Sequence, residues 1–175
     1  MITEELSDGM KILDVGASNR ALGDKLLRKF PAITYKTMDI DRAQVHDYYT
    51  LEEISETFDM IILSEVIEHL EFQEAMAMVD QLLTLLTNHG SLIISTPNIH
   101  HPNRYWCDPD HKTPYSYESA GAALLTAGFK VTKIYRIYND QILRRLFRLY
   151  FASYLHRYLD VDFAASIVVV ARKVP

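Results

Sequence analysis

Two carboxylates and two histidines are the residues of this chain whose types and spacing best suit proton transfer or metal binding. Glu65, Glu68 and His69 fall within the stretch EVIEH, in which positions three and four apart share one helical face. His111 follows in the segment DPDHK, in a loop that could fold over the same opening. A histidine there could accept the proton of a substrate hydroxyl, and the full set could hold a divalent ion. A third interpretation, in which Glu68 and His69 only brace a helix start, stays open.

A second group of residues suits the binding of a nucleotide, because it follows apolar, strand-like runs. Gly16 follows residues 11–15 and has no side chain to block a ligand that lies on the backbone. Asp39 ends the run 33–38, and its carboxylate could accept hydrogen bonds from both hydroxyls of a ribose. Alone, Gly16 could make a tight turn and Asp39 could cap a helix, but corresponding strand ends favour a shared ligand. The predicted binding residues are Gly16, Ala17, Ser18, Asp39, Ile40 and Ser64.

The elements that must position these residues are parallel strands, because short apolar runs alternate with longer amphipathic stretches. Parallel strands covered on both faces are apolar throughout. The predicted strands are residues 11–15, 33–38, 58–63, 91–95, 129–135 and 164–171. The predicted helices are residues 19–30, 72–86, ended by the turn 88–90, and 117–127, with a further helical segment at 140–159. The stretch 99–115 has the composition of a loop, and loops of such length are usually functional or mobile.

Length and composition predict one domain that covers residues 1–175, with a helical insertion at about 140–160 before the last strand. The net charge of −5 argues against a broad basic surface for nucleic acid. Cys107 is the only cysteine, so an internal disulfide is excluded. The N-terminus lacks the basic start and apolar core of a secretory signal, and no long apolar run follows. We therefore expect a cytoplasmic protein that does not span a membrane.

The order of these motifs resembles the class I S-adenosylmethionine-dependent methyltransferases. The similar segments are ILDVG at 12–16, MD at 38–39, FDMII at 58–62, SEVIEHL at 64–70, GSLIISTPN at 90–98 and AGF at 127–129. The resemblance extends from about residue 10 to 128 and more loosely to the end. It implies an α/β fold with a Rossmann-like, seven-stranded, mostly parallel sheet, helices on both faces and an antiparallel last strand. It also implies that Gly16 lies beside the methionine part of S-adenosylmethionine and that Asp39 binds its ribose.

The first turn departs from the GxGxG pattern of that family. Residues 16–20 read GASNR, so Ser18 and Arg20 stand at the second and third glycine positions. This departure predicts weaker cofactor binding or, at the extreme, a degenerate binding module without catalysis. Gly23, one turn into the following helix, is expected to substitute in part. A dinucleotide dehydrogenase is disfavoured because the GxGxxG spacing that seats a pyrophosphate is absent.

The EVIEH stretch also resembles the metal motif of ubiquinone-type O-methyltransferases and of small-RNA 3′-terminal 2′-O-methyltransferases. The latter share the segments STPN and DHK, matched here at 95–98 and 110–112. The expected activity is methyl transfer to an oxygen or nitrogen of a small-molecule or glycan- or lipid-linked acceptor. The alternatives are a metal-dependent RNA 3′-end 2′-O-methyltransferase and the non-catalytic module. A divalent metal is compatible with the motif, but no ligand set is assigned. The catalytic candidates are Glu65, Glu68, His69 and His111.

Aromatic and basic residues outside these motifs bear on the acceptor and on partners. Tyr105, Trp106 and Tyr115 are expected either to shape the acceptor pocket or to be core contacts of the loop that covers it. Residues 141–159 carry four arginines among aliphatic and aromatic residues, and no acidic residue interrupts them. Such a basic amphipathic helix could lie on an anionic membrane surface or clamp a polyanion. Packing on the sheet, covering the acceptor pocket and a dimer contact are its other interpretations, and no oligomeric state follows from the sequence.

Overall fold

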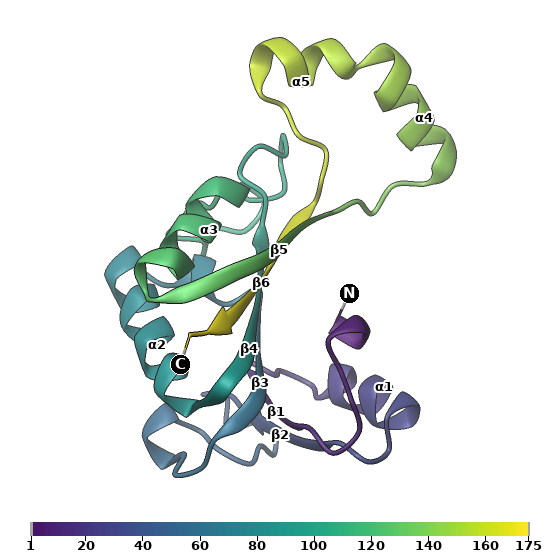
Figure 1. The fold of residues 1–175 in the computed structure, drawn as a ribbon. Coiled ribbons are helices and arrows are strands. Elements are labelled where there is room, and N and C mark those ends of the chain that lie inside the picture. The colour runs from purple at the N-terminus through teal and green to yellow at the C-terminus, as the bar shows by residue number, and fades with distance from the viewer. Residues whose placement is uncertain (1, 175) are drawn as a thin grey trace.

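The alternating apolar runs form one sheet, which the computed structural model describes over residues 2–174 (Figure 1). The strands are β1 (Lys11–Val15), β2 (Thr34–Met38), β3 (Phe58–Ser64), β4 (Leu86–Pro97), β5 (Phe129–Ile137) and β6 (Ser166–Lys173). Their order across the sheet is β2-β1-β3-β4-β6-β5. All pairs are parallel except those of β6, which runs antiparallel to both β4 and β5. The predicted α/β class with an antiparallel last strand is confirmed.

The expectation of seven strands is wrong for residues 2–174, because the sheet has six. The chain between β2 and β3 holds a short 3-10 helix, Leu51–Glu53, and one isolated bridge between Met38 and Tyr48. This stretch is mostly polar and contains no run of β-branched or aromatic residues long enough for a further edge strand. The seventh strand was implied by the family resemblance alone, whereas the residue pattern itself predicted six.

Helices cover both faces of the sheet, as predicted (Figure 1). On one face lie α2 (Phe72–Leu85) and α3 (Tyr117–Thr126), and on the other lies α1 (Ala21–Lys29). Successive strand residues alternate between the two cores, since side chains along a strand point to opposite faces. In β1, for example, Leu13 belongs to the core under α2 and α3, whereas Ile12 belongs to the core under α1. Burial of both sides explains why the strands are apolar throughout.

Several element boundaries shift by one or two residues, and the boundary between α2 and β4 differs most from the prediction. The predicted turn at 88–90 is part of β4, which begins at Leu86 directly after α2 ends at Leu85. Leu86 pairs with Phe58, and the register shifts between Phe58 and Met60. The asparagine, histidine and glycine of this segment therefore mark an irregular strand start, where His89 has a φ of +66°, rather than a helix stop.

Two long segments leave the sheet at its carboxyl edge. The first, residues 98–116, is closed at its base by a bridge between Asn98 and Tyr115. The second connects β5 to β6 and contains α4 (Ile142–Phe151) and α5 (Ser153–Leu159), which project from the body in Figure 1. We call residues 138–165 the arm. None of the helices formed by residues 2–174 combines the length and apolar character needed to cross a lipid bilayer.

Gly23 has a packing function that differs from the predicted one. A Cβ added there would lie 2.5 Å from Cε1 of Tyr35, whose ring is buried against α1. The Tyr35 hydroxyl donates a short hydrogen bond to the Asp14 carboxylate, so the ring cannot easily move aside. Gly23 thus admits Tyr35 to the core, where the ring reaches Asp14 at the end of β1.

We predict that Gly23→Ala lowers the free energy of unfolding by about 1 to 3 kcal/mol, because overpacking against Tyr35 outweighs the gain of about 1 kcal/mol in helix propensity. Gly121→Ala is the matched control, since its Cβ would meet only the flexible Cδ1 of Ile134 at 3.3 Å. Urea unfolding should show the control unchanged or slightly more stable. Equal stability of the two variants would contradict this account of Gly23.

Candidate functional site

The turn after β1 is fixed against the ends of two neighbouring strands. The Gly16 and Ala17 N–H groups both donate to the carbonyl of Met38, at 2.8 and 3.3 Å. A Cβ at Gly16 would lie 2.4 Å from Cγ2 of Val66, in the turn after β3. The turns after β1, β2 and β3 are therefore packed together, as their positions at the carboxyl edge predict.

Three alternate residues of this turn share the left-handed backbone conformation. Gly16 has a φ of +74°, Ser18 of +49° and Arg20 of +58°. The positions at which the sequence lacks glycine thus keep a glycine-like backbone. Ser18 is held there by a hydrogen bond from its N–H to Oδ2 of Asp39 at 2.8 Å, and Asn19 Oδ1 accepts the N–H of Ala21 at 3.1 Å. Ser18 and Arg20 therefore adopt the backbone conformation for which glycine is the usual residue.

Asp39 connects the turn after β2 to the turn after β1. Its Oδ2 accepts the Ser18 N–H, and its Oδ1 accepts the N–H of Asp41 at 2.9 Å. The residue is partly exposed, and the neighbouring Ile40 is 81% exposed. Each carboxylate oxygen can accept more than one hydrogen bond, so Asp39 can organise the turn and still accept hydroxyl donors from a ligand.

A buried cluster of polar side chains lies next to the turn after β1, and the sequence did not predict it. The Asp14 carboxylate accepts the Tyr35 hydroxyl, and burial raises the pKa of Asp14 to about 6, although that hydrogen bond opposes the rise. The imidazole of His46 is buried nearby, and neither ring nitrogen has a hydrogen-bond partner among residues 2–174. The alternation of polar and apolar residues in β2 gave no sign that Tyr35 and Asp14 would meet.

Glu68 is the most unusual carboxyl group of the candidate site. Its side chain is fully buried, and neither carboxylate oxygen makes a hydrogen bond of normal geometry with residues 2–174. Burial raises the pKa of Glu68 to about 7, and the negative charge of Glu65 adds to the rise. The Thr96 hydroxyl is near enough to oppose this rise slightly, although the pair lacks hydrogen-bond geometry. Such a group is stable either as a neutral acid or beside a cation.

His69 and His111 lie beside Glu68, because the loop docks on the backbone of the turn after β3. The Glu68 carbonyl accepts the N–H groups of Lys112 and Thr113, at 2.7 and 3.1 Å. The rings of His69 and His111 consequently lie 4.8 Å apart, as their predicted positions suggest. Nδ1 of His111 donates to the carbonyl of Tyr105 at 2.7 Å, which leaves Nε2 to accept a proton or bind an ion.

Glu68, His69 and His111 form a set that could hold a metal ion. One ligand atom from each lies within 4.8 Å of the others. One carboxylate and two imidazoles are donors that zinc and other borderline divalent ions accept. The partnerless, buried carboxylate of Glu68 is the observation that makes this set fit a cation, since a cation would compensate its charge.

Glu65 does not join this set, contrary to the expectation that it shares a helical face with Glu68 and His69. The helix there is only the 3-10 turn η3 (Ile67–His69), and Glu65 precedes it with a φ of +53°. Its carboxylate accepts the Ser95 hydroxyl at 3.0 Å and lies 3.5 Å from the Arg104 guanidinium. Ser64, also at this edge, shares a hydrogen bond with Ser95 at 2.9 Å. Glu65 thus fixes the long loop to β4.

The three aromatic residues predicted for the acceptor pocket separate in the structure. Tyr115 is buried in the core under α3, which favours the interpretation that it is a core contact of the loop. Tyr105 is buried against the His111 ring, with ring centroids 5.1 Å apart. Trp106 is 69% exposed and is the one of the three that a ligand could reach from solvent.

A family model described as "Methyltransferase domain" matches residues 2–134 of this chain. No curated protein matches the chain in sequence. Among solved structures, a SAM-dependent methyltransferase from Archaeoglobus fulgidus superposes with a TM-score of 0.78 at 16% identity, over 98% of this chain and 90% of that one. The N-methyltransferase NodS from Bradyrhizobium japonicum, solved in complex with S-adenosyl-L-homocysteine, gives 0.64 at 14% identity, over 95% and 79%.

A third similar structure comes from a complex between the Haloferax volcanii Trm112 methyltransferase activator and a putative methyltransferase. It has a TM-score of 0.71 at 12% identity and covers 97% of this chain and 85% of that one. At such identities the structural matches show a shared fold and nothing more. The family match shows that the chain contains a methyltransferase domain.

The raised pKa of Glu68 predicts how stability depends on pH in protein kept metal-free with a chelator. The folded protein holds the proton up to about pH 7, whereas the unfolded chain releases it near the ordinary value of 4.5. The free energy of unfolding should therefore fall by about 2 to 3 kcal/mol between these values as pH rises. Glu68→Gln should remove this dependence. Urea unfolding measures the free energy of unfolding of both proteins at each pH. If it depended on pH in the same way for the wild type and for Glu68→Gln, Glu68 would not be a protonated buried acid.

Proposed function

Because the chain belongs to the methyltransferase-domain family, we propose that it transfers the methyl group of S-adenosylmethionine to an oxygen or nitrogen of a small-molecule or glycan- or lipid-linked acceptor. The observation that carries the proposal is the turn at Gly16, whose left-handed backbone is hydrogen-bonded to Met38 and to Asp39. A nucleoside would bind along this turn, with its ribose hydroxyls on Asp39 and its base toward the exposed Ile40. The presence of S-adenosyl-L-homocysteine in the similar NodS structure supports the choice of cofactor.

The reaction needs an acceptor held in line with the methyl–sulfur bond, so positioning supplies much of the rate. The acceptor oxygen or nitrogen forms the new bond to the methyl carbon while the carbon–sulfur bond breaks, and the sulfonium becomes a neutral thioether. For a hydroxyl acceptor, the proton must leave. His69 and His111 are the candidate proton acceptors, since an imidazole is the side chain best matched to this task near neutral pH.

A metal-dependent version of the same activity is the second candidate function. It is favoured by the set Glu68, His69 and His111, in which a buried carboxylate without partners lies beside two imidazoles. A divalent ion held there would lower the pKa of a coordinated hydroxyl. The metal-dependent RNA 3′-end 2′-O-methyltransferase is one form of this candidate, and the net charge of −5 argues against it.

The non-catalytic binding module is the remaining alternative. It rests on Ser18 and Arg20 in place of two glycines. The left-handed φ values of both residues argue against it, because Ser18 and Arg20 adopt the conformation that glycines at these positions would favour. A measurement of cofactor binding distinguishes the methyltransferase from the non-catalytic module, and it needs no knowledge of the acceptor.

We predict that Asp39→Asn weakens binding of S-adenosylhomocysteine by about 10- to 100-fold, the effect of losing one charge-assisted hydrogen bond. Asp80→Asn, at an exposed position of α2, is the matched control and should bind like the wild type. Isothermal titration calorimetry measures all three affinities. If the wild type produces no heat with either S-adenosylmethionine or its demethylated product, the binding module replaces the enzyme.

His69→Ala and His111→Ala should each lower methyl transfer by about 10²- to 10⁴-fold, the usual contribution of a general base, and leave the affinity for S-adenosylhomocysteine nearly unchanged. Turnover is measured with hydroxyl acceptors after chelator treatment and again after adding Zn²⁺ or Mn²⁺. Activity that survives the chelator supports proton transfer, whereas activity that returns only with the ion supports the metal-dependent candidate. Full activity of both variants in both conditions would remove the two histidines from the mechanism.

A further inference from the structure

The helices of the arm expose their apolar side chains to solvent. In α4, one face carries Ile142, Leu143, Leu146, Phe147, Tyr150 and Phe151, which are between 44% and 81% exposed. The rings of Phe147 and Phe151 stack on each other 5.3 Å apart, on the side away from the body. In α5, Tyr154 and Tyr158 are one turn apart and also exposed. We call this set of residues the outer face of the arm.

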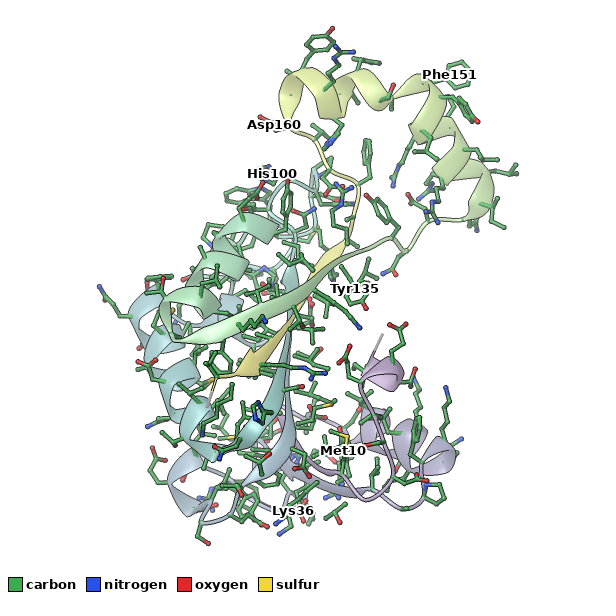
Figure 2. The ribbon with its side chains drawn as sticks, in the orientation of Figure 1. Met10, Lys36, His100, Tyr135, Phe151 and Asp160 are labelled. Carbon is green, nitrogen blue, oxygen red and sulfur yellow. The ribbon has the colours of Figure 1, made fainter. Side chains whose placement is uncertain are left out.

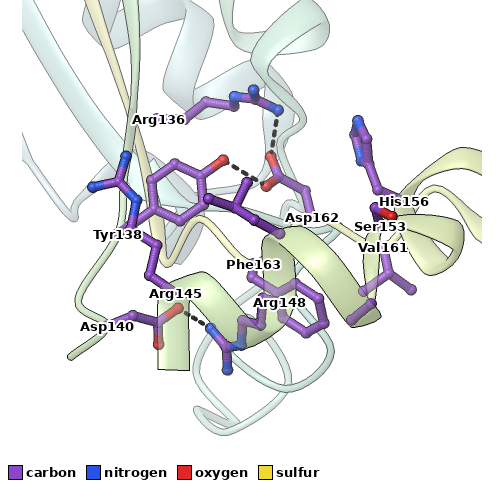
Figure 3. Close-up of a pocket in the computed structure, with 12 residues that line it drawn as sticks. Arg136, Tyr138, Asp140, Arg145, Arg148, Ser153, His156, Val161, Asp162 and Phe163 are labelled. Atoms are coloured by element: carbon purple, nitrogen blue, oxygen red, sulfur yellow. Dashed lines mark hydrogen bonds and ion pairs between the residues drawn. The ribbon is translucent and has the colours of Figure 1, made fainter. Parts of the chain in front are cut away.

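Two of the three arginines of α4, Arg145 and Arg148, contact residues at the base of the arm, whereas an ordinary surface helix exposes its polar face and buries its apolar one. Arg148 forms a short ion pair with Asp140 and lies over the ring of Phe163 (Figure 3). Arg145 lies over the ring of Tyr138. These residues line a pocket of about 370 Å³ that is formed by the arm itself together with Arg136 near the end of β5. The inward contacts of the two arginines fix the orientation that exposes the apolar outer face.

The base of the arm is held at the carboxyl edge of the sheet, beside the long loop of the candidate site. Asp162 accepts hydrogen bonds from Arg136, Tyr138 and Asn98, and its own N–H donates to the carbonyl of His100. Figure 2 labels His100 on the body below Asp160, with Phe151 at the far end of the arm. Whatever the outer face binds therefore lies on the same side of the molecule as the turns at Gly16 and Glu68.

The side-chain types and the charge of the outer face favour one kind of binding partner. Residues 141–159 contain four arginines and no acidic residue, in a chain with a net charge of −5. Aliphatic and aromatic side chains flanked by arginine and tyrosine match the boundary between headgroups and acyl chains of an anionic bilayer. A second copy of the arm would place like charges against one another. An RNA would favour a row of outward-facing arginines, but Arg145 and Arg148 contact residues at the base of the arm, and most exposed side chains of α4 are apolar.

We propose that the arm docks the protein on an anionic membrane surface, with the outer face inserted at the headgroup level, so that the methyl acceptor is an amphiphile presented by that membrane. The identity of the acceptor rests on the proposed methyl transfer, whereas the docking does not. Docking is therefore measured without turnover, and the methyltransferase activity can fail while the membrane contact stands.

The experiment is co-sedimentation of the full chain with large vesicles of phosphatidylcholine, with and without phosphatidylglycerol, at low and high salt. The wild type should sediment with the anionic vesicles and be released by salt, because charge attraction decays within the Debye length. The double variant Phe147→Ser/Phe151→Ser and the double variant Arg144→Glu/Arg157→Glu should each lower the partition coefficient by at least about tenfold.

The controls are Leu125→Ser, at an exposed apolar residue of α3, and Lys25→Glu, at an exposed residue of α1, both outside the arm. Both should sediment like the wild type. A circular dichroism spectrum and a thermal unfolding midpoint like those of the wild type show that the fold of each variant is intact. The proposal is overturned by a wild type that stays in the supernatant with anionic vesicles, or by arm variants that sediment as well as it does. It is overturned equally by an arm that binds only single-stranded RNA, or one that only dimerises the protein in sedimentation velocity runs.

Discussion

The left-handed backbone of the turn after β1 is the constraint on which the candidate cofactor site depends. Gly16 must be glycine for two reasons, its φ of +74° and the 2.4 Å that would separate a Cβ from Val66. At Ser18 the same conformation costs about 1 to 2 kcal/mol. A hydrogen bond from a backbone N–H to a carboxylate contributes about 1.5 to 3 kcal/mol. Asp39 can therefore offset the missing glycine, so the acidic residue and the altered turn act as one unit.

The other half of the site depends on backbone contacts made by the long loop. Lys112 and Thr113 donate to the Glu68 carbonyl, and this fixes His111 over a carboxyl group that has no side-chain partner of its own. An ionised, buried and unpaired carboxylate would cost several kcal/mol. Two states avoid that cost, the neutral acid and the carboxylate beside a cation. The same geometry thus accommodates both the proton-transfer and the metal-dependent candidates, and the ionisation of Glu68 distinguishes them.

The sequence predicted the six strands, the covering helices and the meeting of His69 with His111, because each follows from local periodicity or from a position at a strand end. It could not predict contacts set by tertiary packing. Tyr35 meets Asp14 only because Gly23 leaves room for its ring. The spacing of Glu65, Glu68 and His69 predicted that they share one face of a continuous helix. In the structure only a single 3-10 turn forms, and Glu65 lies before it in the left-handed conformation, so its side chain does not join those of Glu68 and His69. Tyr115 proved to be a core residue, since composition cannot tell a buried loop residue from one that lines a pocket.

The antiparallel direction of β6 explains why a long insertion can lie at the carboxyl edge of the sheet without disturbing the core. Ile137, Ser166 and Pro97 lie in register, so the arm leaves β5 and returns to β6 at the edge where the parallel strands end. A crossover between parallel strands must return to the opposite edge, but a hairpin connection has both ends at one edge. The contacts of Asp162 with Asn98 and Arg136 hold the base of the arm at this edge. Helices there are free to face outward, because the sheet is already covered by α1, α2 and α3.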